Sequence, residues 1–395
     1  MKILMLTPYL PYPLHSGGQI RSYNLLKNLA KKHQVTLFSF IRSNQEKQYI
    51  KELTKYCHKV QVFKRRQAWD LRNIILAALT PYPFLVSIYL SRSLRSHIAK
   101  ELASADYDLI HAETFYVMPS LPGEAKVPTL LVEQTIEYLV YQRFVETFKF
   151  LPLKPLLYFD VLKIKLWEKY FWKKATRLVA MSESDKEIMQ QAGKNLKVDV
   201  VANGVDIDHF ATIKPSQTKA PTILFVGNFK WLPNKDAAKF LANDIWPKII
   251  SQLPQARLWI VGRNPTQDIL ALAKKPHISV TGNLADIRTA FKKANVLLAP
   301  IRNGRGTKYK VLEAMASQVP VVTTQLGIEG IAAQPGKSVL LAETADSLAQ
   351  KTIKVLTNKS LSKKLATNGK QLVYSQYNWQ VISQKLDKIY QQLGA

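Results

Sequence analysis

Short, continuous runs of apolar residues recur along the whole chain and alternate with stretches of helical periodicity. Runs of this kind, rich in Val, Leu and Ile, are typical of β-strands that are covered on both faces. In the first half they are Ile3–Thr7, Val35–Phe40, Val60–Phe63, Leu109–His111, Thr129–Val132, Leu178–Met181 and Val198–Ala202. In the second half they are Thr222–Val226, Arg257–Val261, Ile278–Val280, Val296–Ala299, Val319–Val322 and Val339–Leu341. Helical stretches separate most of them, which predicts βα repeats and parallel sheets.

A polar segment that contains two prolines divides this pattern into halves. It is ATIKPSQTKAP, residues 211–221. A chain of 395 residues exceeds what one hydrophobic core usually serves, so two domains are expected. We therefore predict an α/β protein with two doubly wound, Rossmann-like domains, 1–210 and 222–375, joined by this linker. The two sheets are expected to face a central cleft, with ligands at the carboxyl ends of their strands.

Residues 138–177 depart from the repeat, because they form a long helical stretch crowded with aromatic and basic side chains. A basic amphipathic helix of this kind can lie in an anionic membrane surface. Its aromatic residues can equally be core contacts and its lysines a solvated face, so both interpretations stay open. The earlier apolar run, Leu71–Leu90, is interrupted by Pro81 and Pro83, which argues against a membrane-spanning helix. Five arginines flank that run and could belong to the same surface: Arg65, Arg66, Arg72, Arg92 and Arg95.

The formal net charge of +28 points to an anionic partner. Nucleic acid, an anionic membrane and phosphorylated small molecules are the three classes that fit. No Cys/His finger, aromatic RNP-type strand or basic zipper accompanies the charge, which disfavours nucleic acid. The single cysteine, Cys57, excludes a disulfide framework and a cysteine-based metal cluster, and the first strand does not read as a signal peptide. We expect a cytoplasmic protein, and attachment to the inner face of the plasma membrane stays open.

The stretch NGRGTKYKVLEAMASQVPVV, residues 303–322, carries the most chemical information. It follows an apolar run and predicts a glycine loop, a helix from about residue 308 to 317, and a buried strand. Such a loop aims backbone N–H groups and a helix N-terminus at one point, where a phosphate can bind. Glu313 lies among apolar neighbours and needs a partner, such as a pair of sugar hydroxyls. The alternative is an ordinary αβ turn in which Glu313 pairs with Lys310.

Several motifs together resemble the family 4 glycosyltransferases. GNFKWLPNKDAAKFL, IVGR, VTGN and GTKYKVLEAMASQVPVV resemble the carboxyl-terminal domain of that family. PYPLHSGGQIRSYNLLKNLA, YDLIHAE, SESD and NGVD agree with its amino-terminal domain. The resemblance implies the two-domain GT-B fold, a retaining mechanism, and a nucleotide-sugar donor used without metal or other cofactor. It also implies that residues 376–395 form a last helix that returns toward the first domain.

The resemblance assigns Glu313 to the donor ribose hydroxyls. The family carries another glutamate eight residues earlier, where this chain has Arg305. The pattern resembles a subgroup with G-x-G-T-[RK]-x-K at this point, so a variant enzyme is expected, with donor-sugar recognition in question. Gly306 and Thr307 are expected at the diphosphate. Lys308 and Lys310 are the candidate cations there, and our choice is Lys308.

Donor-binding residues are also expected after the first strand of the second domain. Asn228, after Gly227, stands where the family commonly has an arginine. Lys230 and Lys235 are then the nearby cations for the diphosphate, since fixed charges must neutralise the leaving group in a metal-free reaction. Arg263, which ends IVGR, is placed with them.

The amino-terminal domain offers a second group of candidates. His111 and Glu113 end a strand where the family often has an H-x-H pattern, and Glu113 could orient the acceptor hydroxyl or accept its proton. A structural role for His111 is the alternative. Gly17 and Gly18 would let the backbone approach the diphosphate closely, and Arg21 could add charge.

Two further signals are discounted. Asp206-Ile207-Asp208 matches the D-x-D of metal-using enzymes but lies in the NGVD segment, and no G-x-G-x-x-G follows the first strand. The expected function is transfer of a sugar from a UDP- or GDP-sugar to a saccharide or lipid-linked saccharide, in bacterial envelope polysaccharide or glycolipid synthesis. A weakly catalytic sugar-nucleotide-binding or membrane-associated assembly protein and a GT-B-like epimerase remain as alternatives.

Overall fold

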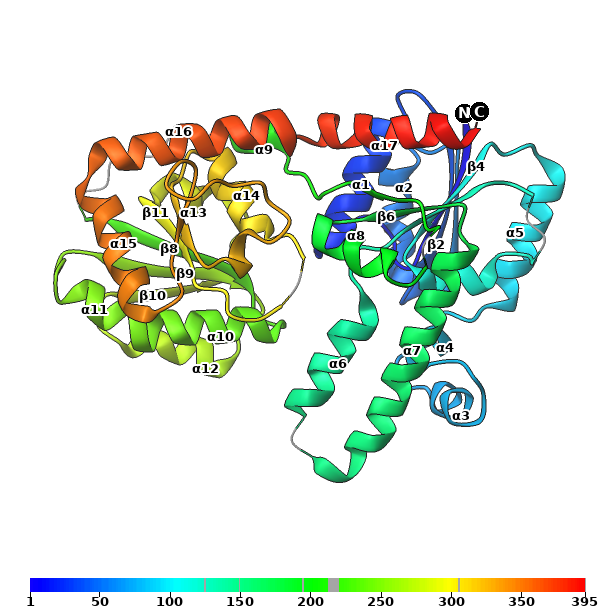
Figure 1. Cartoon of the computed structure of the whole chain (residues 1–395), viewed down its shortest axis with the longest axis horizontal. Helices are drawn as coiled ribbons and strands as arrows, with labels where there is room; N and C mark the ends of the chain where they lie inside the picture. The colour runs from blue at the N-terminus through cyan, green and yellow to red at the C-terminus, as the bar shows by residue number, and fades with distance from the viewer. Residues whose placement is uncertain (124–125, 149, 194, 212–219, 305, 395) are drawn as a thin grey trace. The chain divides into compact units, whose positions relative to one another are not determined.

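The computed structural model describes residues 1–123, 126–148, 150–193, 195–211, 220–304 and 306–394 (Figure 1). The chain forms two compact units. Unit 1 contains Met1–Ala202 and Ile382–Ala395, and unit 2 contains Asn203–Val381. The break between the units therefore falls at Ala202, some residues before the polar segment 211–221, most of which lies outside the described residues.

Unit 1 is built on one parallel sheet with helices between its strands (Figure 1). Its strands are β1 (Lys2–Thr7), β2 (Gln34–Ile41), β3 (Lys59–Lys64), β4 (Leu109–Glu113), β5 (Thr129–Val132), β6 (Arg177–Ala180) and β7 (Val198–Val200). Its helices are α1 (Gly17–Leu29), α2 (Ile50–Leu53), α3 (Leu71–Leu79), α4 (Phe84–Ser87), α5 (Arg92–Ser104), α6 (Glu137–Thr147), α7 (Lys154–Lys174) and α8 (Glu183–Gln190). The strand order is β3-β2-β1-β4-β5-β6-β7, and every pair is parallel.

Unit 2 repeats this architecture. Its strands are β8 (Thr222–Asn228), β9 (Arg257–Arg263), β10 (Ile278–Gly282), β11 (Val296–Ala299), β12 (Val321–Thr323) and β13 (Leu340–Leu341). Its helices are α9 (Ile207–Ala211), α10 (Leu232–Phe240), α11 (Trp246–Ile250), α12 (Gln267–Leu270), α13 (Arg288–Lys293), α14 (Tyr309–Ala316), α15 (Ala345–Thr357) and α16 (Lys359–Gln376). The strand order is β10-β9-β8-β11-β12-β13, again all parallel. The last helix, α17 (Trp379–Gly394), lies largely within the residues of unit 1.

Each predicted apolar run has become a strand, and the α/β prediction is confirmed. Both sheets reverse their direction of growth beside the first strand of the unit. In unit 1 the reversal lies between β1 and β4, and in unit 2 it lies between β8 and β11. Connections on the two sides of such a point run to opposite faces of the sheet, so the strand ends there are open to a ligand. The fold therefore singles out the loops that follow β1, β4, β8 and β11.

The stretch 138–177 forms a helical hairpin, α6 and α7, which project together from the sheet (Figure 1). One side of α7 enters the core, since Ile164, Phe171 and Trp172 are buried. Other aromatic residues of the hairpin, Phe159 and Tyr170 among them, are exposed. Core contacts thus account for only some of the aromatic residues. Among the described residues, no helix is long and apolar enough to cross a membrane.

Two buried glutamates attach this hairpin to the sheet. Glu168 accepts hydrogen bonds from the backbone N–H groups of Glu137 (2.8 Å) and Tyr138 (3.1 Å), at the start of α6. Glu133, after β5, accepts one from the Trp172 indole N–H (3.0 Å), while its Oε2 has no partner among the described atoms. Burial, followed by the charge of Glu168, raises the pKa of Glu133 well above its ordinary value, and burial also raises that of Glu168. The folded state therefore holds protons here that the unfolded chain releases.

We predict that Glu133→Gln stabilises the protein increasingly as the pH rises. Because the pKa of this carboxyl is raised on folding, the native state binds the extra proton, and stability is lost as the pH climbs from about 4.5 toward the folded pKa. The amide keeps the Trp172 contact but needs no proton. Urea unfolding should show a gain on the order of 1 kcal/mol at about pH 8 and little at about pH 5. Glu146→Gln, on an exposed glutamate of the same hairpin, is the control. A pH-independent difference would contradict the prediction.

Candidate active site

The glycine loop between β11 and α14 is held against α10. Arg302 forms a two-pronged ion pair with Asp236 (3.1 and 2.7 Å), and its guanidinium stacks on the Phe240 ring at 4.0 Å. Gly304 (φ +94°) and Gly306 (φ +84°) adopt backbone conformations that residues with a Cβ atom rarely adopt. The loop therefore needs glycine at both positions. Arg305, between them, lies outside the described residues, so the effect of this departure from the family motif stays untested.

Lys308 serves the loop itself. Its ammonium donates to the carbonyl oxygens of Gly306 (2.5 Å) and Gly304 (3.3 Å) and lies 3.8 Å from the Glu329 carboxylate. The neighbouring Thr307 hydroxyl is buried and has no hydrogen-bond partner among the described atoms. The loop thus presents an unused hydroxyl, while Lys308 holds the backbone in place. The prediction that Lys308 neutralises a diphosphate directly stays a prediction.

Lys310 is the buried cation of unit 2. Its ammonium donates to Asn234 Oδ1 (2.7 Å) and lies 4.5 Å from the Phe225 ring centre. Asn234 in turn donates from Nδ2 to the Asn228 carbonyl (2.9 Å), which ties α14 to the end of β8. Gly227 leaves room for this amide, since a Cβ there would lie 3.0 Å from Asn234 Cγ. Burial, and then the charge of Lys308, lower the pKa of Lys310 to about 7.

Glu313 is a partly exposed carboxylate in the middle of α14. No hydrogen bond or ion pair within the described part of the chain reaches it, and the Lys310 ammonium bonds to Asn234 instead of to Glu313. Burial raises the pKa of Glu313 to about 7, although the charge of Lys310 opposes the shift. The i,i+3 pair of the alternative interpretation is thus not formed. A carboxylate without donors, in the helix that follows β11, is suited to accept hydrogen bonds from a ligand.

The predicted residue Asn228 shares its edge of the sheet with two asparagines that were not predicted, Asn264 and Asn283. Asn264 donates from Nδ2 to Asn228 Oδ1 (3.3 Å) and from its backbone N–H to Asn283 Oδ1 (3.3 Å). The three asparagines follow glycines at the ends of β8, β9 and β10, which pair with one another across the sheet. Asn264 and Asn283 have positive φ. The sequence does carry a signal for these residues. A glycine near the end of each strand is followed by asparagine, directly in Gly227-Asn228 and Gly282-Asn283 and after one residue in Gly262-Arg263-Asn264. Of the predicted cations on this edge, Lys230 and Arg263 are exposed and Lys235 is half-buried.

In unit 1 the candidate residues His111 and Glu113 form a closed network. Both side chains are fully buried, and His111 Nε2 lies 3.1 Å from Glu113 Oε1. Burial alone would raise the pKa of Glu113, but the His111 hydrogen bond and charge, with Arg21, lower it overall. The ionised carboxylate only accepts, so His111 Nε2 donates to it, and Nδ1 is hydrogen-bonded to the Tyr390 hydroxyl. Gln134 Nε2 donates to the other Glu113 oxygen at 2.5 Å.

The amino terminus of α1 fits against this network. A Cβ on Gly18 would lie 2.5 Å from Gln134 Oε1 and 2.3 Å from the Tyr9 hydroxyl. The helix, which includes Gly17 and is capped by Ser16, can approach so closely only with glycine at position 18. Arg21, which is 1% exposed, donates to the Ala202 carbonyl (2.8 Å). The structure thus brings Gly18, Arg21, His111 and Glu113 together at the point where the sheet reverses.

Two features of this network escaped sequence reasoning. Tyr390 comes from α17, far along the chain, and its periodic apolar setting carries no sign of the contact. Thr114, directly after Glu113, has φ +69° and ψ 151°, a region that non-glycine residues rarely occupy. Backbone strain of this kind costs about 1–3 kcal/mol and often marks a functional site. It indicates that the end of β4 is shaped for more than packing.

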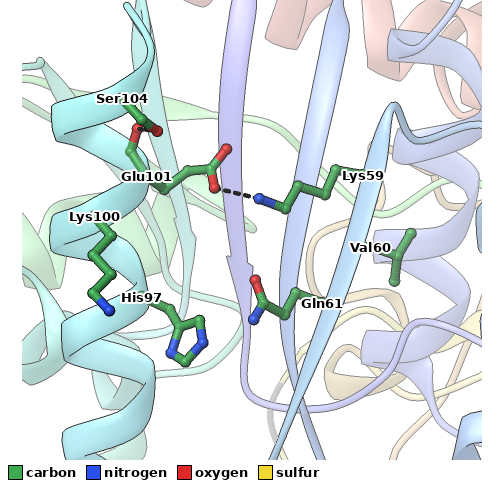
Figure 2. A pocket seen from close by; sticks show the side chains of 7 residues that line it. All are labelled: Lys59, Val60, Gln61, His97, Lys100, Glu101 and Ser104. Atoms are coloured by element: carbon green, nitrogen blue, oxygen red, sulfur yellow. Dashed lines mark hydrogen bonds and ion pairs between the residues drawn. The ribbon is translucent and has the colours of Figure 1, made fainter.

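One hollow of unit 1 lies elsewhere. It has a volume of about 490 Å³ and lies between the edge strand β3 and α5 (Figure 2). An ion pair between Lys59 and Glu101 (2.5 Å) crosses it. Lys59 is the first residue of β3, at the opposite end from the loops that follow the strands. None of the predicted site residues lines this hollow, so it is not the candidate active site.

Family comparisons agree with this geometry. Residues 15–209 match Glycosyltransferase Family 4, and residues 220–358 match Glycosyl transferases group 1. The two matches follow one another along most of the chain. The chain therefore belongs to the family 4 glycosyltransferases, and its two Rossmann-like units are those of the GT-B fold.

Two bacterial proteins illustrate the similarity of the chain to known sequences. An uncharacterized 44.6 kDa protein in the cps region of Klebsiella pneumoniae is 23% identical over 393 residues, covering 95% of this chain and 96% of that protein. Phosphatidyl-myo-inositol mannosyltransferase of Mycobacterium tuberculosis is 29% identical over 206 residues, which cover 48% of this chain and 53% of that enzyme. That second alignment thus spans only about half of each protein.

Solved structures share the fold over the full length of the chain. Sucrose-phosphate synthase from Thermosynechococcus elongatus has a TM-score of 0.74 at 18% identity, covering 100% of this chain and 99% of that one. HepE from Anabaena, in complex with UDP-glucose, has a TM-score of 0.64 at 16% identity, and the match covers 99% of this chain and 100% of HepE. At these identities the likeness concerns the fold alone.

We predict that Glu313 and Lys310 give the stability of the ligand-free protein a minimum near neutral pH. Glu313 takes up a proton on folding, so stability falls as the pH rises from about 4.5 to about 7. Lys310 loses one on folding, so stability rises again above about pH 7. Denaturation at several pH values should show that Glu313→Gln removes the fall in stability below about pH 7 and that Lys310→Met removes the rise in stability above it. Identical profiles in both variants and the parent would refute this.

We predict that Tyr390→Phe lowers stability by about 1–3 kcal/mol, because the buried His111 Nδ1 then loses its hydrogen-bond partner. Urea unfolding at neutral pH measures the loss. Tyr374→Phe is the matched control, since that tyrosine is 36% exposed. An equal effect of the two substitutions would show that the His111 contact contributes nothing.

Proposed function

We propose that this glycosyltransferase moves a sugar from a UDP- or GDP-sugar to a hydroxyl of a saccharide or lipid-linked saccharide, with retention of configuration and without a metal. The observation that carries the proposal is Glu313. It is a carboxylate without a donor among the described residues, and it follows the glycine loop. It belongs to the helix that leaves β11, beside the point where the sheet reverses and where α/β sheets bind ligands. The relatives' names, a mannosyltransferase and a cps-region protein, support a role in envelope glycolipid or polysaccharide synthesis. We propose that this synthesis takes place at the cytoplasmic face of the membrane.

In this proposal unit 2 holds the donor. Glu313 accepts two hydrogen bonds from the ribose hydroxyls, and the Thr307 hydroxyl and the backbone amides of the glycine loop bind the diphosphate. Lys310 places a positive charge behind that loop, and Lys230 and Lys235 are close enough in sequence to the same strand end to add to it. Charge that develops on the leaving diphosphate would be stabilised by these fixed groups.

Unit 1 receives the acceptor. His111 and Glu113 are enclosed in the described conformation, and Glu113 already has Gln134 and His111 as donors. Their proposed role is therefore to position: Glu113 holds Gln134, and Gln134 lies against the first turn of α1. The earlier interpretation, in which Glu113 or His111 takes the proton of the acceptor, requires one of them to become exposed. A Glu113→Gln variant distinguishes the two roles, because a positioning residue affects the acceptor KM more than the pH profile of kcat.

Donor binding tests the proposal directly. Thermal unfolding with UDP-glucose, UDP-N-acetylglucosamine and GDP-mannose should show one donor that stabilises the protein, since ligands stabilise the state that they bind. Mass spectrometry with saccharide and polyprenyl-linked acceptors should then detect transfer, with EDTA present throughout. Donor binding without transfer to any acceptor would identify a binding protein instead. Conversion of the donor sugar in the absence of an acceptor would identify an epimerase.

We predict that Glu313→Gln weakens binding of that donor by about tenfold or more, because hydrogen bonds to charged groups contribute about 1.5–3 kcal/mol. Since the pKa of Glu313 is about 7 in the empty site, donor affinity of the parent should fall as the pH drops below 7. Isothermal titration at several pH values should show that this dependence disappears in the variant. Glu183→Gln, a similar change on an exposed glutamate of unit 1, should leave it intact. Donor affinity that is unchanged in Glu313→Gln would remove this residue from the site.

A further inference from the structure

Helix α3 turns its apolar side to the solvent. Leu71, Ile74, Ile75 and Leu79 are spaced so that they share one face of the helix, and they are 71%, 51%, 55% and 80% exposed. Trp69, just before the helix, is 79% exposed. A helix on a globular domain normally points this stripe toward the core. Here the whole stripe is uncovered.

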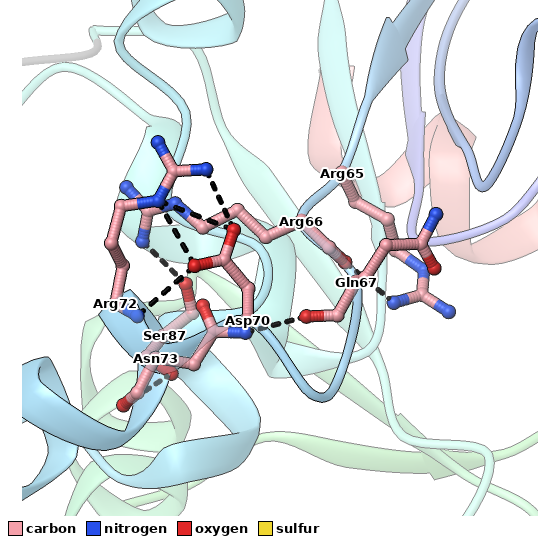
Figure 3. Close-up of polar contacts among 7 residues, drawn as sticks. All are labelled: Arg65, Arg66, Gln67, Asp70, Arg72, Asn73 and Ser87. Carbon is pink, nitrogen blue, oxygen red and sulfur yellow. Dashed lines mark hydrogen bonds and ion pairs between the residues drawn. The ribbon is translucent and has the colours of Figure 1, made fainter.

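Polar contacts on the opposite side of α3 fix this orientation (Figure 3). Asp70 caps the first turn, and Asn73, which is fully buried, donates from Nδ2 to the Gln67 carbonyl (2.7 Å). Ser87 donates to the Asn73 carbonyl (3.3 Å), and Arg66 donates to the Ser87 carbonyl (3.1 Å). These contacts hold the polar side of α3 against the protein. The exposed stripe is therefore a property of the fold and not of a loosely attached helix.

Helix α7 carries a second exposed stripe beside the first. Phe159, Leu162, Leu166 and Tyr170 repeat at helical spacing on the side of α7 away from its buried residues, and each is about half exposed. Lys163 joins the two helices. Its ammonium donates to the Ala77 and Thr80 carbonyls at the end of α3 and lies 5.0 Å from the Phe159 ring centre. The indole N–H of Trp167 also donates to the Pro81 carbonyl, at 2.8 Å.

We propose that the outward faces of α3 and α7 dock the protein on an anionic lipid bilayer. In the docked state the two helices lie in the interface, with Trp69, Ile75, Leu79 and Phe159 among the acyl chains. Exposed apolar stripes with aromatic residues and flanking basic side chains are the features of helices that lie in a membrane surface. With nine residues, α3 is too short to span a bilayer.

The distribution of charge favours this partner. Lys165, Lys173 and Lys174 are exposed on α7, and Lys169 is half-buried. Arg72 is exposed on α3 but is paired with Asp70 (2.7 Å). α3 contains no acidic residue, and of the two in α7, Glu168 is buried and Asp160 accepts from the Phe84 N–H. A second copy of the chain would bring these cations against one another, which is repulsive. An anionic leaflet attracts them, by about 1 kcal/mol for each basic side chain near the surface.

Vesicle co-sedimentation without nucleotide or acceptor tests the docking surface independently of the proposed transfer reaction. The parent protein should bind phosphatidylcholine vesicles that contain phosphatidylglycerol, and binding to pure phosphatidylcholine should be at least tenfold weaker. Leu71→Gln and Ile75→Gln should each weaken binding by about tenfold, since each removes a buried apolar side chain from the lipid. Leu270→Gln, an exposed leucine of unit 2, is the control and should have no effect.

The basic residues are tested in the same way. The double variant Lys173→Gln, Lys174→Gln should weaken binding to the anionic vesicles by about tenfold, while Lys363→Gln, Lys364→Gln on α16 should not. Brominated lipid should quench the tryptophan fluorescence of the bound protein, and this quenching should be weaker in the Trp69→Phe variant than in the parent. All these positions are exposed, so thermal unfolding should confirm that the variants are folded.

Three results would overturn the proposal. The first is no co-sedimentation with anionic vesicles even at low salt. The second is equal binding by the face variants and their controls. The third is a concentration-dependent dimer that Ile75→Gln abolishes, which would make the face an interface between two copies of the chain. Failure of the transfer assay leaves these measurements unaffected.

Discussion

Parallel pairing of every strand is the constraint on which both candidate sites depend. A parallel strand must be followed by a crossover, so the loops that leave the carboxyl ends gather on one edge of the sheet. Each sheet reverses its direction beside its first strand, β1 in unit 1 and β8 in unit 2. The glycine turns and titratable residues follow the strands that flank those two points. The position of these loops in the topology, more than any single motif, therefore makes Glu113 and Glu313 candidate site residues.

The two glutamates show how different environments give similar side chains different tasks. Glu113 is fully enclosed, yet donors from His111 and Gln134 reach both of its oxygens and its pKa stays below the ordinary value. Glu313 is less enclosed but has no donor among the described residues, so burial raises its pKa to about 7. A carboxylate that is satisfied and fully buried, as Glu113 is, stabilises its surroundings and is not open to a ligand. An unsatisfied one destabilises the empty site and regains that energy when hydroxyl donors arrive.

Much of this arrangement could be predicted from the sequence, because it depends on local signals. Apolar runs located every strand, and glycines located the loop at Gly304 and Gly306, where positive φ excludes other residues. Long-range partners could not be predicted. Tyr390 reaches His111 across most of the chain, and Asn234 accepts from the Lys310 ammonium, which the alternative interpretation had paired with Glu313. Contacts of this kind arise from tertiary packing, for which neither periodicity nor composition carries a signal.

Amphipathic periodicity has a related limit, and α3 illustrates it. A stripe of Leu71, Ile74, Ile75 and Leu79 shows that the helix has one apolar face, but the pattern is the same whether that face meets a core or a membrane. The direction is decided by the other side, where Asn73 is bound to the Gln67 carbonyl and Lys163 to the last carbonyls of the helix. Buried polar groups need specific partners, whereas apolar groups need only the absence of water. Those specific contacts therefore orient the helix, and they leave the apolar stripe to be covered by something outside the chain.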